Sequence, residues 1–255
     1  MKKMMAFIKK EWMELKRGGK LVVSFIVFML FAVLDAGIAK LTPVLFDLMA
    51  DELADQGLNI IQTDVTAAQC WDQFNGNLLV LFIVFVIMFA GILVNEYQKG
   101  TLVLIVTKGM PRKGIYFAKL IMIVAVWTVN YAMMTALTWF YGDYYWDNSI
   151  MHHMFGAIMG IWLFGVMLCC LIMFFSTIVK GMSGVLLCIG GFAFTCSIIG
   201  FVPGVDKYLP TTLSDMMTVM RGGADISIPA IIICIVICVA STIGGNILIE
   251  KKVTL

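Results

Sequence analysis

The stretch LLVLFIVFVIMFAGILV, at residues 78–94, decides the class of fold. It holds 17 residues without a charge, and as a helix it would rise about 25 Å against a hydrocarbon core of about 30 Å. Lipid offers no hydrogen-bond partner to an open backbone. A segment this apolar is therefore predicted to cross a membrane as a helix.

Five further apolar runs are long enough to do the same. They occupy residues 21–39, 120–140, 155–178, 183–202 and 228–249. Of the 255 residues, 61% are apolar and 13% are charged, about half the charged share of an average soluble domain. A water-soluble enzyme could not bury that much apolar surface, and a disordered chain would not contain it. The sequence predicts an all-α, polytopic membrane protein with six transmembrane helices across residues 21–255.

The basic residues alternate with these six runs. Fifteen of the 18 Lys and Arg residues lie before the first run, in the second and fourth connections, or in the tail. The other side of the membrane receives Lys40, Lys207 and Arg221 together with eleven acids. By the positive-inside rule, both termini are expected in the cytoplasm of a cell, with the chain in the cell membrane.

Residues 1–20 are predicted to form an amphipathic helix on the cytoplasmic side. Met5, Ile8, Trp12 and Leu15 recur at a helical spacing, and lysines and glutamates fill the positions between them. Such a helix either lies on the membrane surface, with Trp12 in the headgroup layer, or is an elbow that also meets a cytoplasmic partner.

The first outer connection, residues 40–77, is long enough to carry two short helices. One is expected to begin at Thr42-Pro43 and to end at Gly57, and the second to begin at Thr63 or Asp64. The pair would form either an acidic cap or a vestibule that meets a cationic or amphipathic substrate.

The last outer connection, residues 203–227, is expected to hold a helix from Pro210 to Arg221. Its apolar face consists of Leu213, Met216, Met217 and Met220. This helix either lies on the surface or re-enters the membrane as a gate or pore lining, where irregular backbone is tolerated only against protein or water.

Residues 95–119, between the second and third runs, form the most specific segment. It contains NEYQKGTL at 95–102 and TKGMPRK at 107–113. A short surface helix is expected here, with Leu102 toward the membrane and with Glu96, Lys99 and Lys108 toward water. Gly109 and Pro111 would end it.

This segment resembles the permease subunit of type-2 ATP-binding-cassette (ABC) exporters. That family carries an acid after the second span, then Gly-Thr-Leu, a Pro/Arg turn and a Lys at the start of the third span. The matching residues here are Glu96, Gly100-Thr101-Leu102, Arg112 and Lys119. The six spans, an N-terminal elbow helix with Lys10, Glu11 and Trp12, and a re-entrant segment before the last span also fit. Gly109, where the family often has Pro, and Ala118, where it often has Gly, depart from the pattern.

The resemblance implies a cytoplasmic coupling helix that sits in a cleft of a separate ATPase subunit. The residues implied in this coupling are Glu96, Lys99, Gly100, Thr101, Leu102, Lys108 and Arg112. Glu96 would bind a basic group on the partner. The chain has no G-x-x-x-x-G-K-[S/T] motif, so ATP and magnesium are expected on the partner ATPase and no catalysis on this chain.

The resemblance also implies a second permease subunit, in a homodimer or heterodimer, and an exported amphipathic substrate. A peptide is the expected substrate, with a small hydrophobic drug or sodium as alternatives. Residues expected at a dimer face or on the substrate path are Phe25, Phe28, Asp35, Met216, Met217 and Met220. No nucleic acid is expected to bind.

Two other classes of membrane protein compete with this interpretation. A secondary transporter would need ionisable groups in its spans. Asp35 is the only acid within a run, and it is placed where it could reach outer water. An intramembrane hydrolase would need a histidine in the bundle, but His152 and His153 lie in an outer connection without further metal ligands nearby in sequence.

Overall fold

The computed structural model describes residues 2–55, 65–107 and 109–251, and within these ranges all regular structure is helical. Six helical segments are long and apolar enough to cross a membrane, which confirms the predicted six-span, all-α fold. They are α2 (Lys20–Asp55), α3 (Ala67–Phe89) with α4 (Val94–Gln98), α6 (Arg112–Tyr145), α7 (Met154–Ile178), α8 (Met182–Gly200) and α10 (Ile228–Lys251). The shorter elements are α1 (Lys2–Arg17), α5 (Thr101–Thr107), α9 (Met217–Met220), η1 (Asn148–Ile150), η2 (Asp206–Tyr208) and η3 (Pro210–Ser214).

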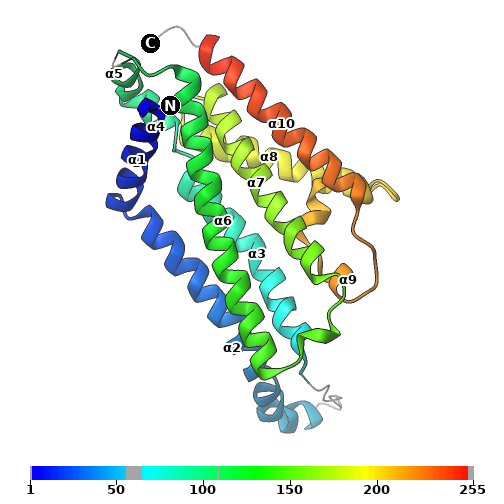
Figure 1. Cartoon of the computed structure of the whole chain (residues 1–255). Helices are drawn as coiled ribbons and strands as arrows, with labels where there is room; N and C mark the ends of the chain where they lie inside the picture. The colour runs from blue at the N-terminus through cyan, green and yellow to red at the C-terminus, as the bar shows by residue number, and fades with distance from the viewer. Residues whose placement is uncertain (1, 56–64, 108, 252–255) are drawn as a thin grey trace.

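Trp127 on α6 lies at the centre of the bundle. Its ring stacks on Phe82 of α3 and Tyr131 of α6, at centroid distances of 5.4 and 5.3 Å. Its indole N–H donates to the backbone oxygen of Trp162 on α7 at 3.1 Å. Gly165 on α7 makes this packing possible, because a Cβ at that position would overlap the Trp127 ring. In Figure 1, α6 and α7 run side by side between α2 and α10.

The first outer connection differs from the prediction of two separate helices. α2 continues through Pro43 to Asp55, and the Thr42 hydroxyl donates to the Ile38 oxygen at 2.7 Å just before the proline. α3 begins at Ala67 after the N-cap Thr66, whose backbone N–H donates to the Gln69 side chain at 2.7 Å. The expected second helix is therefore the first turns of α3.

The last outer connection is broken where one helix was expected. A 3₁₀ turn at Pro210–Ser214 and the short α9 are separated at Asp215, which accepts a hydrogen bond from the Met217 backbone N–H. Met216, Met217 and Met220, which were candidates for a substrate path or a dimer face, are buried against the bundle. A Cβ at Gly160 of α7 would lie 2.9 Å from Met216 Cε, so this segment packs closely on α7.

Two other candidates for a dimer face or substrate path lie in the interior. Phe28 packs against Trp127 with ring centroids 5.9 Å apart, whereas Phe25 is exposed. Asp35 is fully buried, with Oδ1 accepting from Asn77 at 2.7 Å. The expectation that Asp35 reaches outer water is wrong, because α3 covers it.

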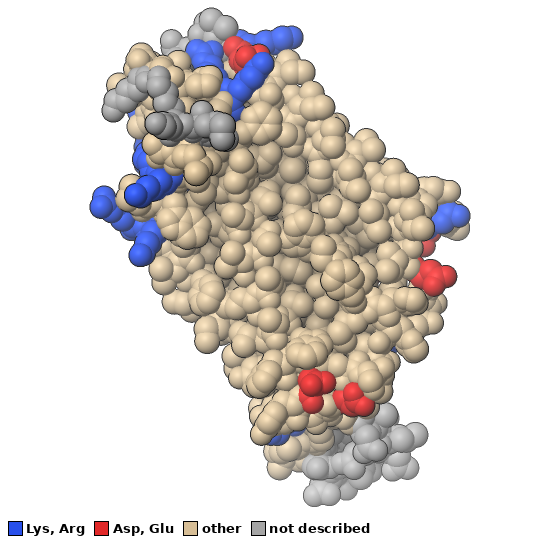
Figure 2. All heavy atoms as spheres, viewed as in Figure 1, with Lys and Arg blue, Asp and Glu red and all other residues tan. Residues whose placement is uncertain are grey.

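The charged side chains gather at the two ends of the bundle. In Figure 2, Lys and Arg cluster at the end that carries α1, α5 and the end of α10, and the face between the ends is free of them. We call this the basic end. At the opposite end, Arg221 pairs with Asp72, so the α9 segment is tied to α3.

Candidate functional site: an ion-pair network at the basic end

α1 packs against α6 through Phe7, Glu11 and Leu15, which follow each other at four-residue spacing and are all buried. Met5 and Trp12, two members of the predicted apolar stripe, are exposed on the surface of the protein. The face of α1 that packs against the protein therefore combines apolar side chains with one carboxylate, Glu11, at its centre.

A sharp break after α1 brings the chain to the first span. Gly19 has φ +74°, a conformation that costs little only for glycine. Lys20 then begins α2, and its ammonium group donates to the Met88 oxygen at 3.0 Å. Because Met88 lies in the last turn of α3, this cation also suits the negative end of that helix.

The segment between the second and third spans consists of two short helices instead of one. α3 ends at Phe89, α4 follows after a turn, and Gly100, with φ +65°, separates α4 from α5. The Gln98 side chain donates to the Lys180 oxygen at 2.9 Å, which ties α4 to the connection between α7 and α8.

Lys119 is the centre of a buried network of charges. Its ammonium nitrogen lies 2.7 Å from Glu11 Oε2 and 2.8 Å from Glu96 Oε1. The exposed fractions are 2% for Lys119, 4% for Glu11 and 7% for Glu96. This one lysine therefore links α6 to the nearby α4 and to α1, which is far from both in sequence.

Lys10 extends the network toward the surface. Its nitrogen is 2.7 Å from Glu14 Oε2, 3.0 Å from Glu11 Oε1 and 4.0 Å from Glu96 Oε1. Partial burial would lower the pKa of Lys10, but the hydrogen bond to Glu14 and the charges of Glu11 and Glu96 together raise it above its usual value. The hydrogen bond from Lys10 lowers the pKa of Glu14. Both effects favour the charged form of the network.

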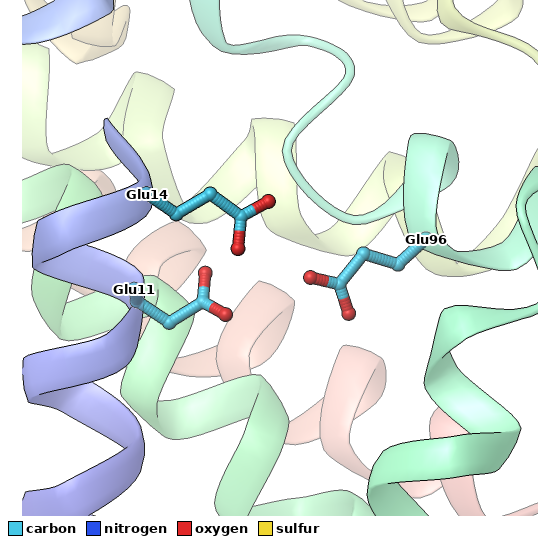
Figure 3. A group of neighbouring side chains, drawn as sticks. All are labelled: Glu11, Glu14 and Glu96. Atoms are coloured by element: carbon cyan, nitrogen blue, oxygen red, sulfur yellow. The ribbon is translucent and has the colours of Figure 1, made fainter. Parts of the chain in front are cut away.

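Glu11, Glu14 and Glu96 point toward one another in Figure 3, with carboxylate oxygens within 4.8 Å of each other. Such a group could hold a metal ion by spacing alone. Here, however, Lys10 and Lys119 contact the same carboxylates and supply the positive charge. The arrangement is that of an ion-pair network that joins helices.

The expectation that Glu96 faces water is wrong. Its carboxylate is buried and bonded within the chain, because the turn after α3 directs α4 back toward α1 and α6. Leu102 is buried as well. Lys99 is exposed, Arg112 donates to the Glu250 oxygen at 3.4 Å, and Lys108 lies outside the described residues. The apolar side chains that α5 leaves exposed are Val103 and Leu104, the latter 62% exposed.

The pairing of Glu11 with Lys119 was not predicted from the sequence. A signal was present, since Lys119 stands between Ala118 and Leu120 at the edge of an apolar run. A lysine in such a place needs a carboxylate partner. The sequence could not tell which of the acids on the same side of the membrane supplies it.

The family described as ABC-2 family transporter protein matches residues 5–217, most of the chain and all of the network. The chain belongs to the ABC-2 transporter family. No curated protein and no solved structure gave a match to it. The family's permeases are membrane subunits of ABC transporters, so this ABC-2 chain is a transport subunit.

In this ABC-2 permease the network can transmit movement between α1, α4 and α6. A displacement of α4 or α5 is passed to α6 through Lys119 and to α1 through Glu11. Charges held at 2.7–2.8 Å in a buried site resist separation, because an unpaired buried charge costs several kcal/mol. The three elements are therefore expected to move together.

Proposed function

We propose that this chain is the permease subunit of an ATP-driven exporter, paired with a second permease subunit and with ATPase subunits that bind ATP and magnesium. The basic end faces the cytoplasm in this proposal, as the positive-inside rule expects, so both termini are cytoplasmic. The family match and the distribution of charge support it.

The observation that carries the proposal is the contrast between the two short helices at the basic end. α4 is fixed to α1 and α6 by Glu96, whereas α5 presents Val103 and Leu104 to solvent. An apolar side chain held outward on a firmly anchored segment fits a cleft on an ATPase subunit. Closure of the ATPase then moves α5, and the network passes the movement to the spans.

Leu104→Asp is expected to reduce capture of the ATPase subunit by at least tenfold. The leucine is the most exposed apolar side chain on α5, and an aspartate would carry a charge into the proposed cleft. The measurement is co-purification of the ATPase with tagged permease. Leu104→Met keeps the apolar volume and should retain capture. Equal capture by the Asp variant would show that α5 does not dock there.

The proposed substrate is amphipathic and most simply a peptide. A groove of about 670 Å³ lies between α3, α7 and α8, with Phe82, Phe164 and Ile189 among its apolar walls. One end is polar, where the Asn75 amide donates to exposed Asp215 at 2.8 Å. An apolar surface with one acidic end suits a molecule that is apolar along one side and cationic at one end.

A cationic amphipathic helical peptide is expected to stimulate ATP hydrolysis by the complex reconstituted in nanodiscs. A scrambled peptide of equal composition should stimulate severalfold less, because it has no continuous apolar face for the groove. Asp215→Asn should raise the half-maximal concentration of the peptide about fivefold, the effect of about 1 kcal/mol. Equal responses to both peptides would refute the peptide proposal, and a response only to sodium or to a small hydrophobic drug would assign the substrate to one of those classes.

A second permease subunit would complete the path, since the groove is open along α8. Only 17% of the residues in the apolar part of α8 are buried within this chain. A Cβ added at Gly190 or Gly191 would meet no atom within 4 Å. α8 therefore has room for close contact with a neighbouring helix.

A further inference from the structure

The face of α1 that points away from the bundle combines basic and apolar side chains. With 100° between successive residues, Lys9, Lys16 and Arg17 fall on the side opposite Phe7, Glu11 and Leu15. Exposed Met5, Trp12 and Met13 lie on the same side. Lys9 and Lys16 are seven residues apart, which puts them two turns and about 10 Å apart along one face.

The basic side chains on this outer face of α1 form no ion pair with the described side chains of the protein. Lys10 and Lys119 satisfy the acids of α1, Glu11 and Glu14. Among the side chains that the structure describes, no carboxylate lies within ion-pair distance of Lys9, Lys16 or Arg17. The outer face therefore carries three positive charges that are available to an anionic partner.

The position of α1 identifies that partner as lipid. Only Gly18 and Gly19 separate Arg17 from Lys20, the first residue of the first span, so Lys16 and Arg17 must lie close to the headgroup layer. Trp12 and the two methionines add apolar surface between the charges, the composition of a helix face that binds at a bilayer interface. An acidic protein segment would match the charges but would leave these apolar side chains unmatched.

We infer that the outer face of α1 binds the phosphodiester headgroups of anionic phospholipids. Lys16 and Arg17 lie nearest the first span and would bind the first headgroup, and Lys9 lies two turns further from the span on the same face. The inner face of the same helix carries Glu11, so lipid binding also fixes the helix that holds Lys119. Anionic lipid should then stabilise the folded permease as any ligand that binds the native state does.

The test counts lipids retained by the purified full-length permease in mild detergent, using native mass spectrometry and an equimolar mixture of phosphatidylglycerol and phosphatidylcholine. The wild type should retain phosphatidylglycerol preferentially, and less of it as salt is raised from about 50 to 500 mM. The triple variant Lys9→Gln, Lys16→Gln, Arg17→Gln should lose this preference by roughly tenfold or more.

A matched control removes the same charge from the same end of the molecule, outside α1. Lys113→Gln, Lys180→Gln, Lys251→Gln neutralises three exposed bases and should retain most of the preference. Phosphatidylglycerol should also raise the Tm of the wild type and of this control more than that of the α1 variant. Equal losses in both triple variants, or equal retention of the two lipids by the wild type, would overturn the inference. Unchanged lipid retention with loss of the ATPase would identify an acidic protein partner and overturn it equally.

Discussion

Lys119→Met is expected to destabilise the permease by about 3 kcal/mol, because it removes the buried cation from between Glu11 and Glu96 and leaves them only the half-exposed Lys10. Methionine fills nearly the same space, so the loss arises from charge and not from a cavity. The measurement is the Tm of the purified permease, followed by intrinsic fluorescence in detergent. Lys113→Met is the control, since Lys113 pairs with Glu250 at an exposed position and should change stability by less than about 1 kcal/mol.

A triple variant tests whether the buried carboxylates cause the loss of stability in Lys119→Met. Adding Glu11→Gln and Glu96→Gln to Lys119→Met removes the two buried negative charges that have lost Lys119 and should recover most of the lost Tm. The same variant should still show weak stimulation of the ATPase by substrate, because neutral side chains hold α1, α4 and α6 together less firmly. A triple variant no more stable than Lys119→Met would show that the network is not the source of the effect.

Gly165→Ala is expected to destabilise the permease by about 1–3 kcal/mol through overpacking. The added methyl group would overlap the Trp127 ring, which is itself held by Phe82, Tyr131 and the hydrogen bond to Trp162. The ring cannot move without disturbing the contact between α6 and α7.

The control for this variant is Gly37→Ala on α2, where a Cβ would meet no atom within 4 Å. Alanine is the better helix former, so this change should leave the Tm equal or slightly higher. A fall in Tm of the same size in both variants would mean that loss of glycine in a helix, and not the clash with Trp127, determines the result.

The number of spans and the all-helical fold could be predicted from the sequence, because each span depends on its own composition. An apolar run such as residues 78–94 has no alternative to a helix in lipid. The end of α3 at Phe89 was missed, since no proline or charge marks it. That break depends on partners from other elements, including Lys20 and Ser176, which hydrogen-bond to carbonyls at the end of the helix.

The site was predicted only in its location. Glu96, Lys119 and the elbow helix were recognised individually from the family resemblance, but their contact depends on how α1 folds back on α6. Hydrophobic spacing indicated a stripe with Trp12 facing the headgroup layer, but it did not indicate the opposite, buried face that centres on Glu11. A periodicity argument treats glutamate as polar and outward, and it fails where a buried lysine binds the carboxylate.

The uninterrupted course of α2 through Pro43 gives the first span a long extension. Its 36 residues correspond to about 54 Å, well beyond a hydrocarbon core of about 30 Å. Proline lacks the N–H for one helical hydrogen bond and bends a helix, so the turns after Pro43 are expected to form an arm set at an angle to the span. A rotation of the first span at the basic end would therefore also turn this arm, and exposed Leu48 with it, outside the opposite leaflet.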